Sequence, residues 1–117
     1  MIYNDSGSTL LARSRPSGTS AASIYSPAPG RKAIITKIIV VEVAGGTTAA
    51  SVFIDEDGTT YDESTALQFA LASEAKGRRI YDFDDGLEVG EDANVAVQVA
   101  TGSSHTFWII GRELDAV

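Results

Sequence analysis

The chain has 117 residues, 44% of them hydrophobic, which suits one folded domain, and it carries 16 acidic against nine basic residues. The lack of cysteine excludes disulfides and thiolate chemistry, and the single histidine, His105, excludes sites built from several histidines. The net charge of −7 disfavours nucleic acid and anionic membranes as partners, and no apolar run is long enough for a transmembrane helix.

The charge is unevenly spread along the chain. Residues 1–32 hold four basic residues and one acidic residue, whereas residues 33–117 hold five basic and fifteen acidic residues. Residues 1–23 are also rich in serine, threonine and glycine, which is typical of a segment without its own core. We therefore expect an extended N-terminal arm over 1–23, with one short strand at 8–13, and a β-sandwich domain over 24–117.

Residues 33–43 form the clearest predicted strand, because they are dense in β-branched side chains and end at Gly45-Gly46. Strict alternation fails in this run, since both its odd and its even positions are mostly apolar. Two explanations are open. A bulge near Thr36-Lys37 switches the faces, or another segment or subunit covers the second face.

Several further segments have the composition or alternation of strands. They are residues 52–55, 67–71, 80–83, 95–99 and 105–110. The composition of residues 63–76 also suits a helix, but the alternation of Leu67, Phe69 and Leu71 favours a strand. Seven or eight short strands without a long helix predict an all-β fold, an antiparallel β-sandwich.

Trp108 is the one large aromatic residue whose orientation matters for function. If Phe107 and Ile109 face the core, then Trp108 and Ile110 face outward and mark a contact surface. The opposite orientation, with Trp108 in the core, is the alternative.

Possible catalytic and metal-binding groups do not form a known motif. His105 follows two serines, but neighbouring strand residues point to opposite faces, so we expect an edge or surface histidine. In the acidic loop 55–63, Asp55, Asp57 and Asp62 are a candidate calcium site, although the spacing departs from that of a calcium hand. The alternative is a solvated turn. We expect no enzyme activity and no cofactor.

Three motifs point to a known group of proteins. A proline-glycine turn at 25–33 leads into the strand 35–40, a glycine-acid turn ends the segment 87–92, and a closing strand covers 107–113. With these motifs, residues 25–113 resemble small jelly-roll-like β-sandwich structural proteins of tailed bacteriophages. The resemblance implies a virion component of the capsid decoration (cement) type, without catalytic residues. It also implies a position on the capsid surface, the major capsid protein as partner, and often a homotrimer whose arms reach neighbouring subunits.

We therefore expect a structural protein that binds and stabilises the assembled phage head. The residues of the arm expected to dock on the capsid are Leu10, Leu11, Arg13 and Arg15. The residues expected to form the subunit interface are Ile34, Ile38, Val40 and Trp108.

The alternative function is a tail-fibre or tail-tip module that binds a glycan of the host surface. Trp108, Tyr61 and Tyr81 would then stack on the sugar rings. Neither nucleic acid nor a membrane is an expected partner under either hypothesis.

Overall fold

A computed structural model describes residues 8–116, which form eight β-strands. The strands are β1 (Thr9–Ser14), β2 (Ala22–Tyr25), β3 (Arg31–Glu42), β4 (Ala49–Asp55), β5 (Ala66–Ala72), β6 (Arg78–Val89), β7 (Asn94–Val99) and β8 (His105–Asp115). No helix in this part of the chain is long and apolar enough to cross a membrane.

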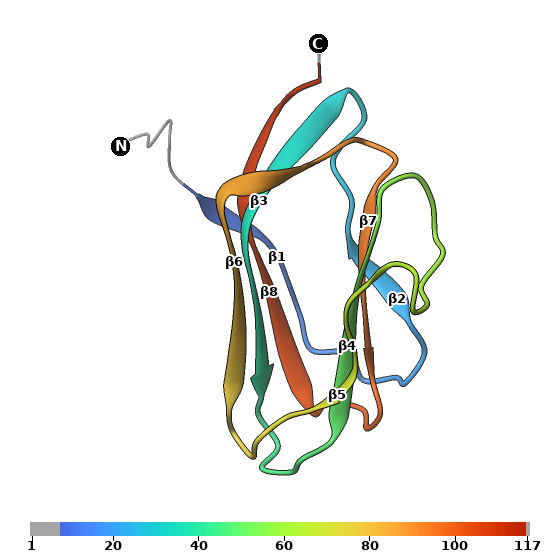
Figure 1. The fold of residues 1–117 in the computed structure, drawn as a ribbon, viewed down its shortest axis with the longest axis vertical. Helices are drawn as coiled ribbons and strands as arrows, with labels where there is room; N and C mark the ends of the chain where they lie inside the picture. The colour runs from blue at the N-terminus through green and yellow to red at the C-terminus, as the bar shows by residue number, and fades with distance from the viewer. Residues whose placement is uncertain (1–7, 117) are drawn as a thin grey trace.

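The strands build two four-stranded sheets that face each other (Figure 1). One sheet has the order β1-β8-β3-β6 and the other the order β2-β7-β4-β5, and all neighbours are antiparallel. The chain passes from one sheet to the other at every connection except that between β4 and β5. Two interleaved four-stranded sheets of this kind make a jelly roll. The predicted all-β antiparallel sandwich is therefore confirmed.

The predicted bulge in the strand at 33–43 is confirmed and explains its two apolar faces. The pairing of β3 with both β6 and β8 shifts between Ile35 and Lys37. Before the shift Ile35 faces the core, and after it Ile38 faces the core, so the inward positions change from odd to even numbers.

The core lies between the two sheets and is filled by aliphatic side chains, one tyrosine and one phenylalanine. Its buried members are Tyr25, Ala33, Ile35, Ile38, Val40, Ala50, Val52, Val89, Ala93, Val95, Val97, Val99, Phe107 and Ile109. The alternation in β7 and in the first half of β8 reflects this layer, because Val95, Val97, Val99, Phe107 and Ile109 are buried in it.

The stretch 63–76, for which a helix was the alternative, contains the strand β5. Tertiary pairing decides the conformation here, because β5 completes an edge of the second sheet beside β4.

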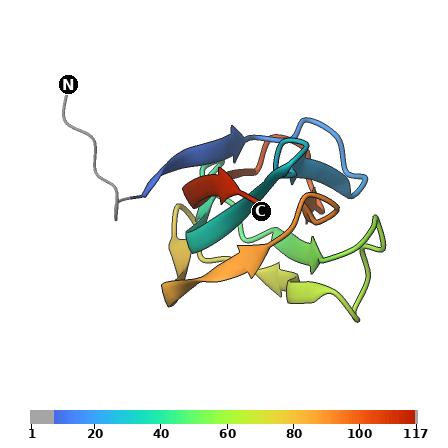
Figure 2. The same ribbon diagram turned by 90° about the horizontal axis from the view of Figure 1, so that it is seen from above.

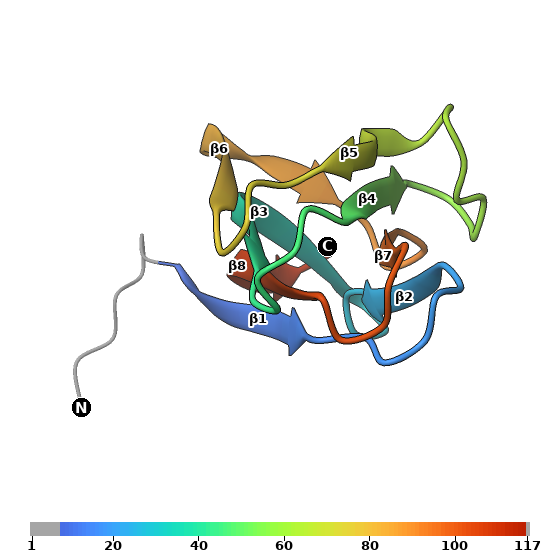
Figure 3. The ribbon, with the colours of Figure 1, turned by 90° about the horizontal axis from the view of Figure 1, so that it is seen from below.

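The described part of the expected arm lies within the sheets. The strand predicted at 8–13 is present as β1 and pairs with β8, while β2, which the sequence did not predict, pairs with β7. Figure 2 shows β1 and β2 along one side of the sandwich, and Figure 3 shows β5 and β6 along the other. Residues 1–7 of the expected arm lie outside the described residues. The division of the chain at residue 23 stays a prediction.

Candidate interaction surfaces

The outer face of the β1-β8-β3-β6 sheet carries a row of large side chains, one from each strand. Arg13 of β1 lies opposite Trp108 of β8, and Ile39 of β3 lies between Trp108 and Ile80 of β6. The Arg13 guanidinium carbon is 5.2 Å from the centroid of the Trp108 ring, which is a cation–π contact. Ile80 is 46% exposed. The expected outward orientation of Trp108 is thus found.

A shallow groove of about 330 Å³ opens along this row. It is lined by Ile39, Val41, Arg78, Ile80 and Trp108. Apolar side chains that share an outer face with a guanidinium group are suited to contact with another protein.

The bulge in β3 corrects part of the predicted subunit interface. Ile38 and Val40 are 0% and 2% exposed, so they belong to the core and offer no outer surface. Ile39 and Val41 take their place on the outer face, because the bulge moves the outward positions to odd numbers. Ile34, which precedes the bulge, is partly exposed.

The four residues expected to dock on the capsid lie in β1 or directly after it. Leu10 is 46% exposed, whereas Leu11 packs against the core. Arg13 covers Trp108, and Arg15 donates from Nε to the Ser103 carbonyl oxygen at 2.9 Å. These contacts attach the segment to the body of the sandwich, while the docking role stays a prediction.

The outer face of the second sheet is partly covered by its own aromatic side chains. Phe53 of β4 is fully buried outside the central core, with the ring centroids of Tyr61 and Phe69 at 6.1 and 6.2 Å. Phe69 itself is 51% exposed. Tyr61 is therefore packed against the protein, which makes it a poor stacking platform for a sugar.

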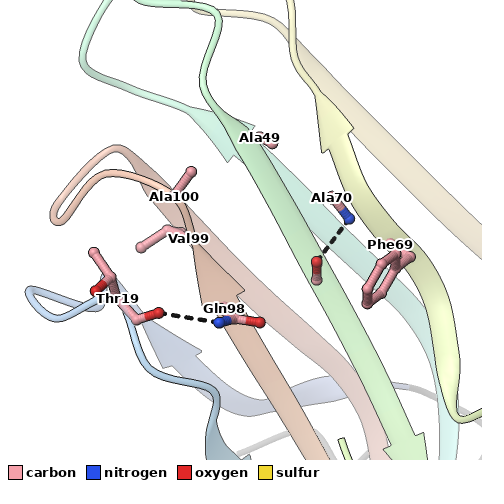
Figure 4. A pocket seen from close by; sticks show the side chains of 8 residues that line it. Thr19, Ala49, Phe69, Ala70, Gln98, Val99 and Ala100 are labelled. Carbon is pink, nitrogen blue, oxygen red and sulfur yellow. Dashed lines mark hydrogen bonds between the residues drawn. The ribbon is translucent and has the colours of Figure 1, made fainter. Parts of the chain in front are cut away.

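Phe69 also borders a pocket of about 230 Å³ on this face (Figure 4). The other lining residues are Thr19, Ala49, Ser51, Ala70, Gln98, Val99 and Ala100. The Gln98 amide donates to the Thr19 carbonyl oxygen at 3.1 Å, and the Ala70 N–H donates to Ser51 Oγ at 2.7 Å. The pocket is uncharged, with one exposed ring and polar groups held in fixed positions.

The acidic loop after β4 uses its carboxylates to hold its own backbone. Asp55 is 6% exposed and accepts from the N–H groups of Thr60 at 2.7 Å and Asp57 at 3.3 Å, which lowers its pKa. Asp62 accepts from the N–H and the hydroxyl of Ser64, and these bonds lower its pKa too. Within residues 8–116, no three acidic or histidine side chains are grouped to hold a metal ion. The calcium site at Asp55, Asp57 and Asp62 stays a prediction.

His105 is fully buried, so the prediction of an edge or surface histidine is wrong. It starts β8 opposite Glu42 of the central strand β3, and its ring nitrogens lie 2.8 Å from Ser73 Oγ and Ser104 Oγ. Burial lowers the pKa of His105, and the nearby Glu42 carboxylate opposes that shift. Both nitrogens contact hydroxyl groups, so the arrangement is not a serine–histidine–carboxylate triad.

The Glu42 carboxylate joins two loops at the same end of the sandwich. It accepts the backbone N–H groups of Ala44, Gly45, Gly46 and Lys76 at 2.8 to 3.2 Å. These hydrogen bonds lower the pKa of Glu42 and keep it ionised. The buried Glu42 carboxylate therefore stabilises these two loops.

The basic residues are concentrated on one of the two sheets. Eight of the nine lysine and arginine residues lie in, or directly after, strands of the β1-β8-β3-β6 sheet, while the strands of the other sheet contain none. The same four strands also contain seven acidic residues, and Arg31, Lys32 and Lys37 form ion pairs with some of them. The sheet therefore carries charges of both signs.

Comparison with known proteins gives likeness in structure only. Neither a protein-family model nor a curated protein matches the sequence. A chain in the acidic stable capsid structure of Helicobacter pylori bacteriophage KHP30 is 18% identical, with a TM-score of 0.53 over 94% of each chain. The two chains share a fold. The coat protein of Tobacco streak virus is 11% identical, with a TM-score of 0.47 over 100% of this chain and 92% of that chain.

The sequence did not reveal three of these surface features. Ile39 and Val41 were hidden by the unknown direction of the bulge, and Phe69 was taken only as a member of a half-buried strand. The third feature is the position of β6 at an edge of its sheet. The available signal in the sequence was the charged residues Arg78, Arg79 and Asp82, which flank a short apolar segment. Only the sheet order shows that this strand is an edge.

Proposed function

We propose that this protein is a structural component of a virus particle. The observation that supports this role is the fold shared with a chain from a bacteriophage capsid. Since 94% of each chain is covered, that chain is about as short as this one, and the likeness extends over nearly all of both chains.

Within the particle, our proposal is a decoration (cement) protein on the outer surface of the assembled head of a tailed bacteriophage. Its partner would be the major capsid protein, and the copies would be grouped as homotrimers. Many copies repeated with the symmetry of the shell would make attachment durable through avidity, even where each copy buries a modest area.

The surface we assign to docking is the outer face of the β1-β8-β3-β6 sheet. It combines the half-buried row of Trp108 and Ile39 with the exposed Ile80, and it includes Leu10 and Arg13 of the predicted docking segment. Apolar side chains surrounded by charged groups provide both affinity and orientation on a complementary surface of the shell.

The test uses heads purified from a phage mutant that lacks this gene. Purified protein is added back, and bound copies per head and the temperature of genome release are measured. We expect saturable binding and a higher release temperature. Absence of the protein from wild-type particles, or no binding to heads, would refute the proposal.

A pair of charge reversals tests the docking surface itself. Arg13→Glu alters the outer face, whereas Lys76→Glu makes the same charge change in the loop before β6. Arg13→Glu should weaken head binding about tenfold or more, while Lys76→Glu should leave it nearly unchanged. Equal effects would show that only net charge matters and would remove this face from the proposal.

The second candidate, a tail module that binds a host glycan, is favoured by the pocket beside Phe69. An exposed ring next to amide and hydroxyl groups is suited to a sugar, and lectin domains also use the jelly roll. A glycan screen tests it with Phe69→Ala and with Leu71→Ala as the control, since Leu71 is exposed on the same strand. Glycan binding lost only with Phe69→Ala would support this function, and a screen without binding would reject it.

A further inference from the structure

The side of the sandwich formed by β5 and β6 contains an unusually regular free edge. Each sheet has two edge strands, and an edge strand exposes backbone groups that can pair with another chain. In β1, β2 and β5 at least one register shift interrupts the pairing. In β6, residues 78–82 keep an unbroken register with residues 37–41 of β3.

The backbone direction shows which groups of this segment point to the free side. The Glu42 N–H donates to the Gly77 carbonyl oxygen at 2.9 Å, so residue 77 directs its carbonyl towards β3. Hydrogen-bonding direction alternates along an antiparallel strand, so residues 79 and 81 also face β3. Arg78, Ile80 and Asp82 therefore direct their N–H and C=O groups to the open side.

The side chains of this segment are complementary to a second copy of themselves. In an antiparallel pair centred on Ile80, each Ile80 lies opposite the other Ile80. Each Arg78 then lies opposite Asp82 of the second copy, so two pairs of opposite charge flank an apolar centre. Arg78, Ile80 and Asp82 carry the free backbone groups, and the same three residues lie opposite their complements. The backbone hydrogen bonds and the side-chain pairs therefore form in the same register.

Other arrangements of the same two strands are less favourable. A parallel pair in the same register places Arg78 opposite Arg78 and Asp82 opposite Asp82. A shift of two residues places Ile80 opposite Asp82, and beyond Asp82 the strand bulges, with Asp84 and Gly86 at φ values of 54° and 108°. The bulge therefore limits the ladder to five residues.

An exposed apolar side chain at this edge adds to the contact. Ile80 is 46% exposed and forms one end of the groove that contains Trp108. A second copy would remove part of the Ile80 side chain from water.

We propose that two copies of this protein associate by antiparallel pairing of residues 78–82, which joins their β1-β8-β3-β6 sheets into one eight-stranded sheet. The contact has two-fold symmetry and is separate from any trimer contact. It does not depend on the proposed role in a virus particle, but in a shell it would link neighbouring copies.

Cysteine cross-linking tests the register, because the natural chain has no cysteine. Opposed residues of a hydrogen-bonded antiparallel pair have Cα atoms about 5.5 Å apart, within the range of a disulfide. Ile80→Cys should give a covalent dimer under oxidation and with a short bis-maleimide. The control is Leu10→Cys, since Leu10 is also an apolar residue 46% exposed on an edge strand of the same sheet. Dimer formation from folded Ile80→Cys no faster than from Leu10→Cys would overturn the proposal.

Charge exchange tests the side-chain complementarity in the cysteine-free protein. By sedimentation equilibrium, Arg78→Asp should raise the dimer dissociation constant about tenfold or more, because both ion pairs become pairs of like charge. Because Asp82 also pairs with Lys37 of its own chain at 3.5 Å, the exchange variant carries three changes, Lys37→Asp, Arg78→Asp and Asp82→Arg. It should restore the dissociation constant to within about threefold of wild type. Circular dichroism confirms folding of each variant. An exchange variant that is folded and as weak as Arg78→Asp would refute this register.

Discussion

Truncation of two neighbouring isoleucines tests the bulge that sets the faces of β3. Ile38 is 0% exposed in the core, whereas Ile39 lines the open groove on the outer face. Ile38→Ala removes buried carbons and leaves a closed cavity, so we expect a loss of about 3 kcal/mol in unfolding free energy. Ile39→Ala leaves a space that water can fill, and we expect a loss of about 1 kcal/mol or less.

The assay is urea unfolding followed by circular dichroism. With a slope of about 1.3 kcal/mol per molar urea for a domain of this size, the two midpoints should differ by about 1.5 M. Val40→Ala and Val41→Ala repeat the comparison on the next pair, since Val40 is 2% exposed and Val41 lines the groove.

Equal losses for Ile38 and Ile39 would refute the switch of faces. A loss at Ile39 that grows with protein concentration would have a different cause, because only burial against another copy depends on concentration. Measurement at two protein concentrations separates these results.

Three further predictions concern single positions. Gly111→Ala should strongly reduce soluble yield and the urea midpoint, because its Cβ would overlap the backbone of β3, whereas Gly90→Ala meets nothing within 4 Å and should be mild. Burial lowers the pKa of His105, so as the pH falls the unfolded chain binds this proton before the folded chain does. The free energy of unfolding should therefore decrease as the pH drops from about 6.5 through the lower pKa of the folded state. His105→Gln should remove this pH dependence from the urea midpoints. An unchanged pH dependence in His105→Gln would show that His105 does not cause it. Arg13→Ala should red-shift Trp108 fluorescence and increase its quenching by iodide, at a cost of about 0.5–1 kcal/mol; an unchanged spectrum would mean that the guanidinium does not cover the ring in solution.

Much of the architecture was predictable because local patterns of side-chain alternation and composition determine it. The alternation in 95–99 and the β-branched run in 33–43 correspond to β7 and β3. The failure of alternation left a bulge near 36–37 as one of two explanations, and the register shift in β3 shows that bulge. Strand β2 was missed, since residues 22–25 have little apolar pattern and are ordered by pairing with β7.

The candidate surfaces were less predictable, because they depend on contacts between distant segments. Both orientations of Trp108 were open in the sequence, and the structure places Trp108 on the outer face because Phe107 lies in the core. Ile38 and Val40 were assigned to the wrong face because the bulge could shift the pattern in either direction. His105 was misplaced because its burial comes from Ser73 and the loops at that end of the sandwich.

The sequence by itself determined the all-β class, the positions of most strands and the lack of cysteine chemistry, because side-chain periodicity and composition are local properties. The tertiary structure decided which strands are edges, which β3 residues face outward and where the basic residues gather. These features depend on pairings such as β3 with β6 and β8, which join residues that are far apart in the chain. The charges at Arg78 and Asp82 were visible in the sequence, but their complementarity between two copies follows only from the position of β6 at a free sheet edge.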